Sequence, residues 1–282
     1  MRRRRSIVMV ALFSALTLLA AACGGGEEGG GSAGGGGGAS DCTWVVGTMG
    51  ALSGDAATIG QPIFAGIEYG VKVANEDFDL GCELVLEEED SQGLPDKAPQ
   101  LAQSLVQNEE TVGIVGPYFS GETEVAGEIF NEAGVPMLTP SATNPTLSEN
   151  GWDTFFRLVG TDAQQAQEAA DFLTDVRGLK TVAIMHDNSE YGKPLAEGVA
   201  AALGDAVTGE LVAINPEETD FSAQISQVKQ TGADGVFFGG YQAEFTEIIK
   251  QGTDAGFDVQ YVSGDGSKAP ELADDPSAQG AV

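Results

Sequence analysis

The chain has 282 residues, with 43 acidic and 13 basic side chains, and its formal net charge at pH 7 is −30. A surface this acidic repels nucleic acid and anionic lipid headgroups, so neither is expected as a direct partner. The chain contains one histidine and three cysteines, which form no metal-ligand pattern in the sequence. We therefore expect no metal and no cofactor, in a chain long enough for two domains.

Residues 1–22 have the three-part shape of an export signal. Four arginines are followed by an apolar run that is too short for a comfortable membrane span. The sequence Ala20-Ala21-Ala22-Cys23 is similar to the lipobox of bacterial lipoproteins, in which Cys23 takes the lipid. The alternative is ordinary cleavage after Ala22, which leaves a free thiol. We expect an extracytoplasmic lipoprotein, anchored to the outer face of the cell membrane.

A glycine-rich segment connects this leader to the rest of the chain. Residues 23–42 begin with the cysteine expected to be lipidated, and residues 24–40 are nearly all glycine, with serine, alanine and two glutamates. Such a composition buries nothing and behaves as a flexible coil, whose seventeen residues from 24 to 40 span ~20–25 Å on average. The segment is therefore predicted to be a tether.

From residue 43 the sequence alternates short apolar runs with segments of helical period, which is typical of an α/β fold. The first series places strands at 44–47, 84–86, 112–115 and 135–138, with helices after the first three. We expect the acidic run Glu87–Asp90 to be a solvated strand end rather than a metal site. In the third helix, Val125, Ile129 and Phe130 are expected to face the core.

A second series of the same kind begins near residue 162. It places strands at 181–185, 207–214, 235–238 and 259–262, each followed or preceded by a helical segment. This repetition predicts two doubly wound, Rossmann-like lobes, at 43–160 and 161–282, that meet at a hinge around 157–161.

The stretch Thr111 to Thr143 reads as strand, loop, helix, strand and loop. Two strands joined by one short helix run parallel, so the loops 118–121 and 141–144 should reach the same sheet edge, where such folds bind ligands. Ser120 also begins a helix, where free N–H groups favour an anion. These loops are expected to seat a small anionic group such as a carboxylate, although simple helix capping by Ser120 and a plain turn at Thr143 remain alternatives.

Six motifs carry a resemblance to a known family, and they occur in family order: GALSGDAATIG (50–60), GPYFSGET (116–123), TPSATNPTLSENG (139–151), AIMHDNSEYGKPLAEG (183–198), TDFSAQISQVKQTGADGVFFGGY (219–241) and SGDGS (263–267). Together they resemble the solute-binding proteins of ABC importers for branched-chain amino acids, the leucine/isoleucine/valine-binding family. The resemblance implies a type I periplasmic binding protein, whose two lobes close on an amino acid in a central cleft. It also implies a monomer without enzymatic activity, which delivers its ligand to ABC permease subunits.

In the first lobe, the resemblance implies that Ser120 and Thr143 hold the ligand carboxylate. Ser141 and Ala142 would contribute backbone groups beside them. Ile59 occupies a position where relatives often have an aromatic residue against the ligand side chain, so the side-chain preference is left open.

In the second lobe, the resemblance implies that Asp265 pairs with the α-ammonium group of the ligand. Tyr191 and Tyr241 would line the pocket. The alternatives are a plain Asp-Gly turn at Asp265 and surface packing for Tyr191. His186 ends a strand beside an aspartate, and a structural role is expected for it.

Cys42 and Cys82 each precede a strand, and these two strands are expected to be neighbours. An exported protein can form a disulfide there, while two separate thiols are the alternative. The resembled family continues beyond the length of this chain, so the first lobe is expected to be incomplete.

Three other functions compete with amino acid transport. The same clamp could serve a sensing receptor, or it could carry an amide, urea or an aromatic acid. Asp265 favours a ligand with an ammonium group. A hydrolase that uses Ser120 is disfavoured, because the sequence has no G-x-S-x-G elbow and places no base beside it.

Overall fold

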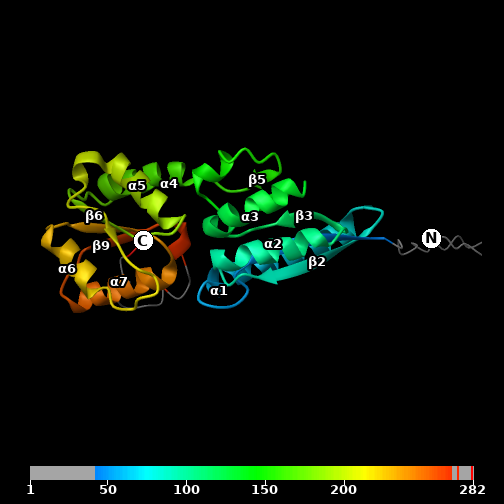
Figure 1. Cartoon of the computed structure of the whole chain (residues 1–282). Coiled ribbons are helices and arrows are strands. Elements are labelled where there is room, and N and C mark those ends of the chain that lie inside the picture. The colour runs from blue at the N-terminus through cyan, green and yellow to red at the C-terminus, as the bar shows by residue number, and fades with distance from the viewer. Residues whose placement is uncertain (1–41, 269–271, 273–280, 282) are drawn as a thin grey trace, which may run out of the picture. The chain divides into compact units, whose positions relative to one another are not determined.

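A computed structural model describes residues 42–268 together with Leu272 and Ala281 (Figure 1). The expected export signal, the lipid-carrying Cys23 and the tether up to residue 41 lie outside the described residues. Within the described part, none of the helices has the length and the apolar character that a membrane span requires.

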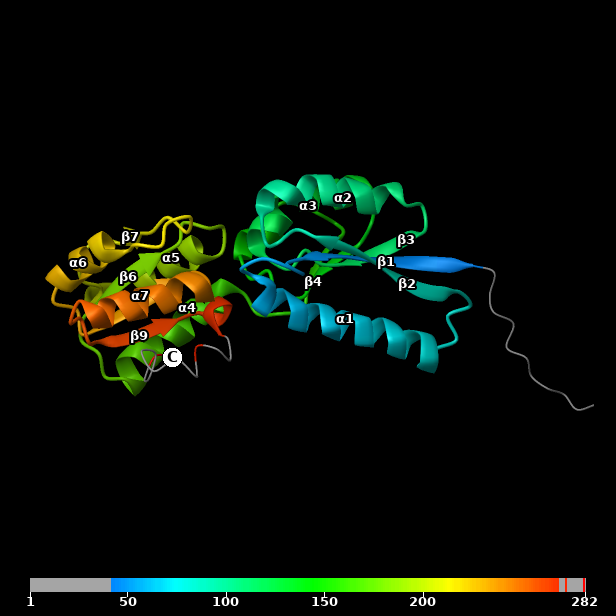
Figure 2. The ribbon, with the colours of Figure 1, turned by 90° about the horizontal axis from the view of Figure 1, so that it is seen from below.

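The first lobe is built on a parallel sheet with the strand order β2-β1-β3-β4-β5. Its strands and helices are β1 (Thr43–Gly50), α1 (Ala57–Asp77), β2 (Glu83–Asp90), α2 (Ala98–Gln107), β3 (Thr111–Val115), α3 (Ser120–Glu132), β4 (Met137–Thr139) and β5 (Phe155–Arg157). Figure 2 shows α1 on one face of this sheet and α2 with α3 on the other. The strand order reverses between β1 and β3, and open parallel sheets bind ligands at such a switch point.

The helices cover the two faces of the first sheet with separate apolar clusters. The larger cluster joins the sheet to α2 and α3 through Met49, Ala98, Ala102, Leu105, Ile114, Ala126, Phe130 and Met137. The smaller one, on the side of α1, contains Ala51, Ile67, Tyr118 and Phe119. Tyr118 and Phe119 belong to the loop after β3, so the smaller cluster also fixes the start of α3.

The acidic run 87–90 is the end of the second strand, as expected, although β2 is longer than the expected 84–86 and this run pairs with Gly47 to Gly50 at the sheet edge. Two other details of the first lobe differ from the sequence expectations. Val112 is 45% exposed because the register between β1 and β3 shifts at this residue. Val125 is 42% exposed, and α3 instead buries Thr123, Ala126, Gly127 and Phe130, which have helical spacing but mostly small side chains.

The second lobe is built on a parallel sheet with the order β7-β6-β8-β9. Its elements are α4 (Asp162–Asp171), β6 (Val182–His186), α5 (Gly192–Leu203), β7 (Val212–Ala213), α6 (Ser222–Gln230), β8 (Gly235–Gly239), α7 (Gln242–Asp254) and β9 (Gln260–Ser263). The strand expected at 207–214 is reduced to β7 and one isolated bridge between Val207 and Val182.

Alternation along β6 shows how the second sheet is buried on both faces. Val182 and Ile184 pack into one cluster with residues of α4 and α5. Ala183 and Met185 pack into another with residues of α6 and α7. Successive side chains of a strand point to opposite faces, so a continuous apolar run is what a strand covered by helices on both sides requires. The α/β class and the two Rossmann-like lobes are therefore confirmed.

A disulfide joins Cys42 and Cys82, whose Cα atoms lie 5.0 Å apart. The two cysteines directly precede β1 and β2, which pair from Thr43 and Glu83 onward. The link therefore closes the end of the sheet opposite to the loops that follow the strands.

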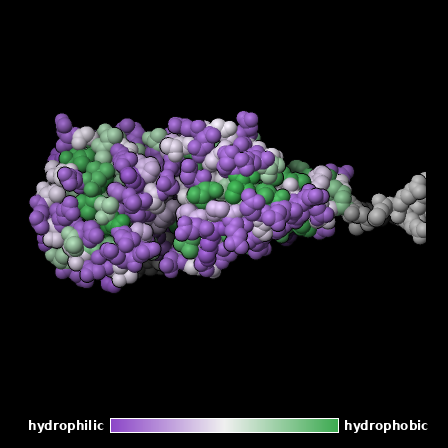
Figure 3. All heavy atoms as spheres, viewed as in Figure 1, coloured by the Kyte–Doolittle hydropathy of each residue, from purple (hydrophilic) through white to green (hydrophobic). Residues whose placement is uncertain are grey.

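The face of the molecule seen in Figure 3 is mainly hydrophilic, with separate hydrophobic patches. Large apolar side chains that remain exposed include Tyr69, Phe78, Phe156 and Leu158.

Candidate functional site

The loops after β3 and β4 contact each other, as the parallel topology predicts. The backbone N–H of Asn144 donates a hydrogen bond to the Ser120 hydroxyl, with 3.3 Å between the two atoms. Ser120 is the first residue of α3 and is buried. This places a hydroxyl and a helix N-terminus together at the carboxyl edge of the first sheet.

Ser120 does not cap its own helix. The residue before it, Phe119, occupies the cap position, and the Glu122 carboxylate accepts a hydrogen bond from its backbone N–H at 3.1 Å. Glu122 also pairs with the Ser91 hydroxyl and is fully buried. Because a serine hydroxyl can donate while it accepts, Ser120 keeps a hydrogen atom to offer to a ligand.

The segment after β4 uses its backbone N–H groups internally. Ala142 N and Ser141 N donate to the Thr139 hydroxyl at 2.9 and 3.4 Å, and that hydroxyl donates to the Pro117 carbonyl at 2.7 Å. The backbone groups that Ser141 and Ala142 could offer to a ligand are therefore their carbonyls. A carbonyl accepts hydrogen bonds, so this edge can also receive a donor such as an ammonium group.

Thr143 lies beside a buried acid that the sequence analysis did not single out. The N–H of Asp162 donates to the Thr143 carbonyl at 3.0 Å, and Asp162 is only 2% exposed. The Thr143 hydroxyl and both carboxylate oxygens of Asp162 are buried and lack a hydrogen-bond partner among the described residues. Burial raises the pKa of the Asp162 carboxyl to about 7; the negative charge of Asp265 adds to the rise, while the nearby Thr143 hydroxyl and Arg157 offset part of it.

The reason why sequence reasoning missed Asp162 is its ordinary local pattern. Thr161 and Gln164 form a capping box around the start of α4, and an acid in the first turn is common in any helix. Only the tertiary structure buries this carboxylate.

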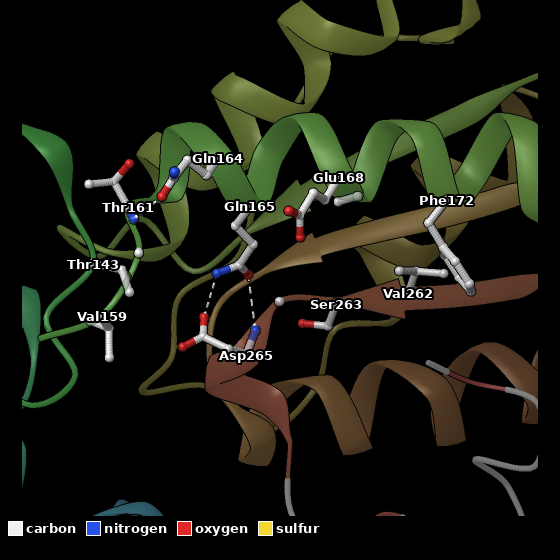
Figure 4. A pocket seen from close by; sticks show the side chains of 13 residues that line it. Thr143, Val159, Thr161, Gln164, Gln165, Glu168, Phe172, Val262, Ser263 and Asp265 are labelled. Atoms are coloured by element: carbon white, nitrogen blue, oxygen red, sulfur yellow. Dashed lines mark hydrogen bonds between the residues drawn. The ribbon is translucent and has the colours of Figure 1, made fainter.

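Asp265 is held in place by two side chains of the second lobe. Tyr191 Oη and Gln165 Nε2 both donate to Asp265 Oδ1, at 2.8 and 2.7 Å. The backbone N–H of Asp265 donates in turn to Gln165 Oε1 at 3.0 Å, and Figure 4 shows this double contact. The carboxylate itself remains exposed, so it is oriented but open to a partner.

The glycines on either side of Asp265 make room for Tyr191. A Cβ atom on Gly264 would lie 2.6 Å from the Tyr191 hydroxyl, and one on Gly266 would lie 2.7 Å from its ring. The N–H of Gly266 also donates to that hydroxyl at 3.0 Å. A plain turn would not need such close packing, so the two glycines serve the seating of Tyr191 against Asp265.

Tyr241 brings the two lobes into contact. Its ring centroid lies 5.1 Å from that of Tyr191 and 5.6 Å from that of Phe119, the latter in an edge-on arrangement. Burial raises the pKa of both tyrosines well above the usual range, so both hydroxyls stay protonated. Ile59 packs into the same small cluster as Phe119 and Tyr241.

A pocket of about 540 Å³ opens between α4 and β9 (Figure 4). Of the seven residues expected to bind a ligand, Thr143 and Asp265 line it, together with Gln165. Ser120, Ser141, Ala142, Tyr191 and Tyr241 are not part of its lining. Tyr191 reaches it through its hydrogen bond to Asp265.

His186 is a buried residue at the end of β6. Its Nδ1 accepts a hydrogen bond from the N–H of Asn188 at 3.1 Å, and burial lowers the pKa of the imidazole. Asp187 accepts hydrogen bonds from Ser189 and so orders the turn that leads to Tyr191. Within the described residues, no group of three or more His, Cys, Asp and Glu side chains could hold a metal ion.

The sequence pattern of one family, described as periplasmic binding protein, matches residues 43–282. The Leu/Ile/Val-binding protein homolog 3 of Brucella melitensis is 34% identical over 224 residues, which cover 78% of this chain and 61% of the relative. The chain thus spans about three fifths of the length of that relative.

Two solved structures show the same fold. The leucine-binding protein LivK of Thermotoga maritima superposes with a TM-score of 0.75 at 26% identity, over 82% of this chain and 66% of the other. A solute-binding protein of an ABC transporter from R. palustris, in complex with 4-hydroxybenzoate, superposes with a TM-score of 0.69 at 26% identity, over 78% and 61% of the two chains.

Proposed function

Because the chain belongs to the periplasmic binding protein family, we propose that it captures a small amino acid, branched-chain or otherwise aliphatic, and delivers it to an ABC permease. The names of the relatives from Brucella melitensis and Thermotoga maritima, which refer to leucine, isoleucine and valine, support this class of ligand.

The observation that carries the proposal is that the site offers one group suited to a carboxylate, Ser120, and another suited to an ammonium group, Asp265. Ser120 offers a hydroxyl at a helix N-terminus, which suits a carboxylate. Asp265 offers a carboxylate that Tyr191 and Gln165 orient, which suits an ammonium group. A zwitterion satisfies both sides at once, whereas either charge would be costly to bury without its partner.

Thr143 takes a different role in this proposal from the one that the resemblance implies. The buried carboxylate of Asp162 lies beside it, and a ligand carboxylate would be repelled there. We place the ammonium side of the ligand at Thr143, Asp162 and Asp265. Ser120 then remains the seat of the carboxylate, with Tyr191 and Tyr241 enclosing the ligand.

Removal of Asp265 tests the proposal. Asp265→Ala should weaken the binding of leucine by ~2–5 kcal/mol, the usual cost of stranding a charge, which is roughly 30-fold to several thousand-fold in Kd. Binding of 4-methylpentanoate, which is leucine without its amino group, should hardly change. Ser120→Ala should weaken both ligands. Isothermal titration calorimetry of each variant with each ligand checks these outcomes, and equal losses for both ligands in Asp265→Ala would refute the amino acid assignment.

An aromatic acid is the second candidate ligand. The R. palustris structure that contains 4-hydroxybenzoate favours it, since that ligand has a carboxylate and no ammonium group. If this candidate is right, calorimetric titration with benzoate or 4-hydroxybenzoate should show tighter binding to the unmodified protein than titration with leucine. A sensing receptor would use the same site for the same ligands.

The proposal includes the location and the assembly of the protein. We infer an export signal at 1–22, lipidation of Cys23 and a tether up to Cys42, which would hold the binding lobes outside the cytoplasm. The lobes 43–160 and 161–282 would move about residues 157–161 as a monomer closes on its ligand.

A further inference from the structure

Asn144, which directly follows Thr143, uses all of its polar groups in hydrogen bonds and is 1% exposed. Its backbone N–H donates to Ser120 Oγ at 3.3 Å, and its backbone carbonyl accepts from Arg157 Nη1 at 2.8 Å. The main chain of Asn144 therefore joins the proposed carboxylate seat to the last residue of β5, where the first lobe leads into the expected hinge.

The side chain of Asn144 reaches the second lobe. Its Oδ1 accepts from the N–H and the hydroxyl of Thr146, at 3.0 and 2.9 Å. Its Nδ2 donates to the backbone carbonyl of Glu190 at 2.7 Å. The opposite orientation of the amide would face an NH₂ group toward the Thr146 donors and an oxygen toward the Glu190 carbonyl, so the contacts on both sides fix this orientation.

The hydrogen bond from Asn144 to Glu190 ends next to Tyr191, which orients Asp265 on the ammonium side of the proposed site. Glu190 precedes Tyr191, whose hydroxyl donates to Asp265. One residue thus connects the loop that seats the carboxylate with the loop that orients the partner of the ammonium group. Another polar contact between the lobes, from Thr58 Oγ1 to Gln242 Oε1 at 3.2 Å, is exposed, so water competes for both groups.

We propose that Asn144 is a positioning residue, which couples the filling of the Ser120 seat to closure of the second lobe through its hydrogen bond to Glu190. The inference rests on the proposed function, because an amino acid ligand would drive that closure. The bond forms only when the two lobes meet, so it stabilises the closed arrangement and slows ligand release without touching the ligand.

Two variants remove the bond in different ways. Asn144→Ser is neutral and keeps an oxygen that can accept from Thr146, but its side chain is too short to reach Glu190. Asn144→Asp keeps the shape and places an oxygen against the Glu190 carbonyl. In both, the Kd for leucine should rise by about 10- to 100-fold, which is the range expected when a part-buried hydrogen bond is lost.

The kinetic pattern separates this role from direct ligand contact. Stopped-flow measurements should show that the increase in Kd comes from faster dissociation, with an association rate within about threefold of the unmodified protein. Leucine and 4-methylpentanoate should be weakened by the same factor, unlike in Asp265→Ala. The matched control is Asn131→Ser, since Asn131 Oδ1 accepts from Asp153 and Thr154 within the first lobe only, at 3.0 and 3.3 Å. Its binding should stay unchanged.

Unchanged dissociation rates in both Asn144 variants would overturn the inference, and so would an equal loss of leucine affinity in Asn131→Ser.

If the unmodified protein binds neither leucine nor 4-methylpentanoate, the proposed function fails, and closure is then measured without ligand. Spin labels at Glu132→Cys and Lys250→Cys, in a chain with Cys23→Ser, should show a short-distance population that Asn144→Ser lacks. Identical distance distributions would refute the role of Asn144 independently of any ligand.

Discussion

Asp162 is the residue with the least favourable surroundings at the proposed site. Its carboxylate is buried without a hydrogen-bond partner among the described residues, and a charge in that state destabilises the folded protein. Side chains that lower stability in this way are typical of positions that a ligand completes. Arg157, whose positive charge acts on Asp162, directs its guanidinium toward the Asn144 carbonyl and Ser148 instead.

The substitution Asp162→Asn should separate stability from binding. At pH 8 the ligand-free variant should melt at the same or a higher temperature, because the buried charge is gone. Its affinity for leucine should fall by about tenfold or more, since one partner of the ammonium group is lost. Thermal unfolding and calorimetry measure the two effects, with Asp171→Asn at the exposed end of α4 as the control. A lower melting temperature with unchanged affinity would make Asp162 a purely structural residue.

For individual residues, the sequence predicts a contact well when the strand topology brings two loops together. It predicts poorly which polar side chains become buried. The meeting of Ser120 with the loop after β4 was predictable, because parallel strands deliver their loops to one edge. The burial of Asp162 and the bonds of Asn144 to Ser120, Arg157 and Glu190 were not, since they depend on residues more than ten positions away. The prediction that Val125 faces the core was wrong for a related reason. Helix α3 packs closely through small residues, which a search for large apolar side chains overlooks.

Among the elements, β1 and β2 form a rigid pair at one edge of the first sheet. They pair in register over eight residues, and the disulfide between Cys42 and Cys82 closes their starting ends. A strand rises ~3.3 Å per residue, so the ligand-binding edge lies ~25 Å from the disulfide. The two features should therefore be energetically separate.

Removal of the disulfide tests that separation. The two cysteines lie 40 residues apart, and a loop of this size is worth roughly 3–4 kcal/mol in the chain-entropy model. The double variant Cys42→Ser/Cys82→Ser should lose about that much unfolding free energy in urea titrations. Its affinity for leucine at 15 °C should equal that of the unmodified protein. A matching loss of affinity would mean that the disulfide also shapes the binding edge.

The periodicity of apolar residues predicted most helices and strands, but not all of their first and last residues. The strand β2 continues through Glu87–Asp90, because an edge strand needs to bury few of its side chains and so tolerates acids. Asp90 at its end accepts hydrogen bonds from Leu52 and Ser53, which ties the loop after β1 to this strand.

For the whole molecule, buried acids decide how stability responds to pH. Burial raises the pKa of Glu122, Asp162 and Glu244 to about 7 each. In the unfolded chain the same groups titrate near 4. Between pH 4 and 7 the folded protein therefore holds more protons than the unfolded chain, and its stability falls as the pH rises through this range. Repulsion within a chain of net charge −30 acts in the same direction.

The ligand-free protein should thus be more stable at pH 5 than at pH 8. Glu122 and Asp162, which are almost fully buried, should each contribute ~2–3 kcal/mol to the difference. Urea unfolding at pH 5, 6.5 and 8 measures it. The variant Glu122→Gln/Asp162→Asn should show a flatter dependence. Stability that rises toward pH 8 would contradict the assignment of these raised pKa values.

The strand order of the first sheet has a consequence for how the chain can assemble during synthesis. After β1 and β2 have paired, β3 adds to the free edge of β1, β4 adds to β3, and β5 adds to β4. Each new strand therefore meets an edge that already exists when it emerges, and no strand has to insert between two earlier ones. Growth in this order keeps the contacts of each step local, which favours rapid folding, and it confines new pairing to one edge while β2 remains the other edge. Cys42 and Cys82 belong to the first pair of strands, so their bond can form before the rest of the chain has folded.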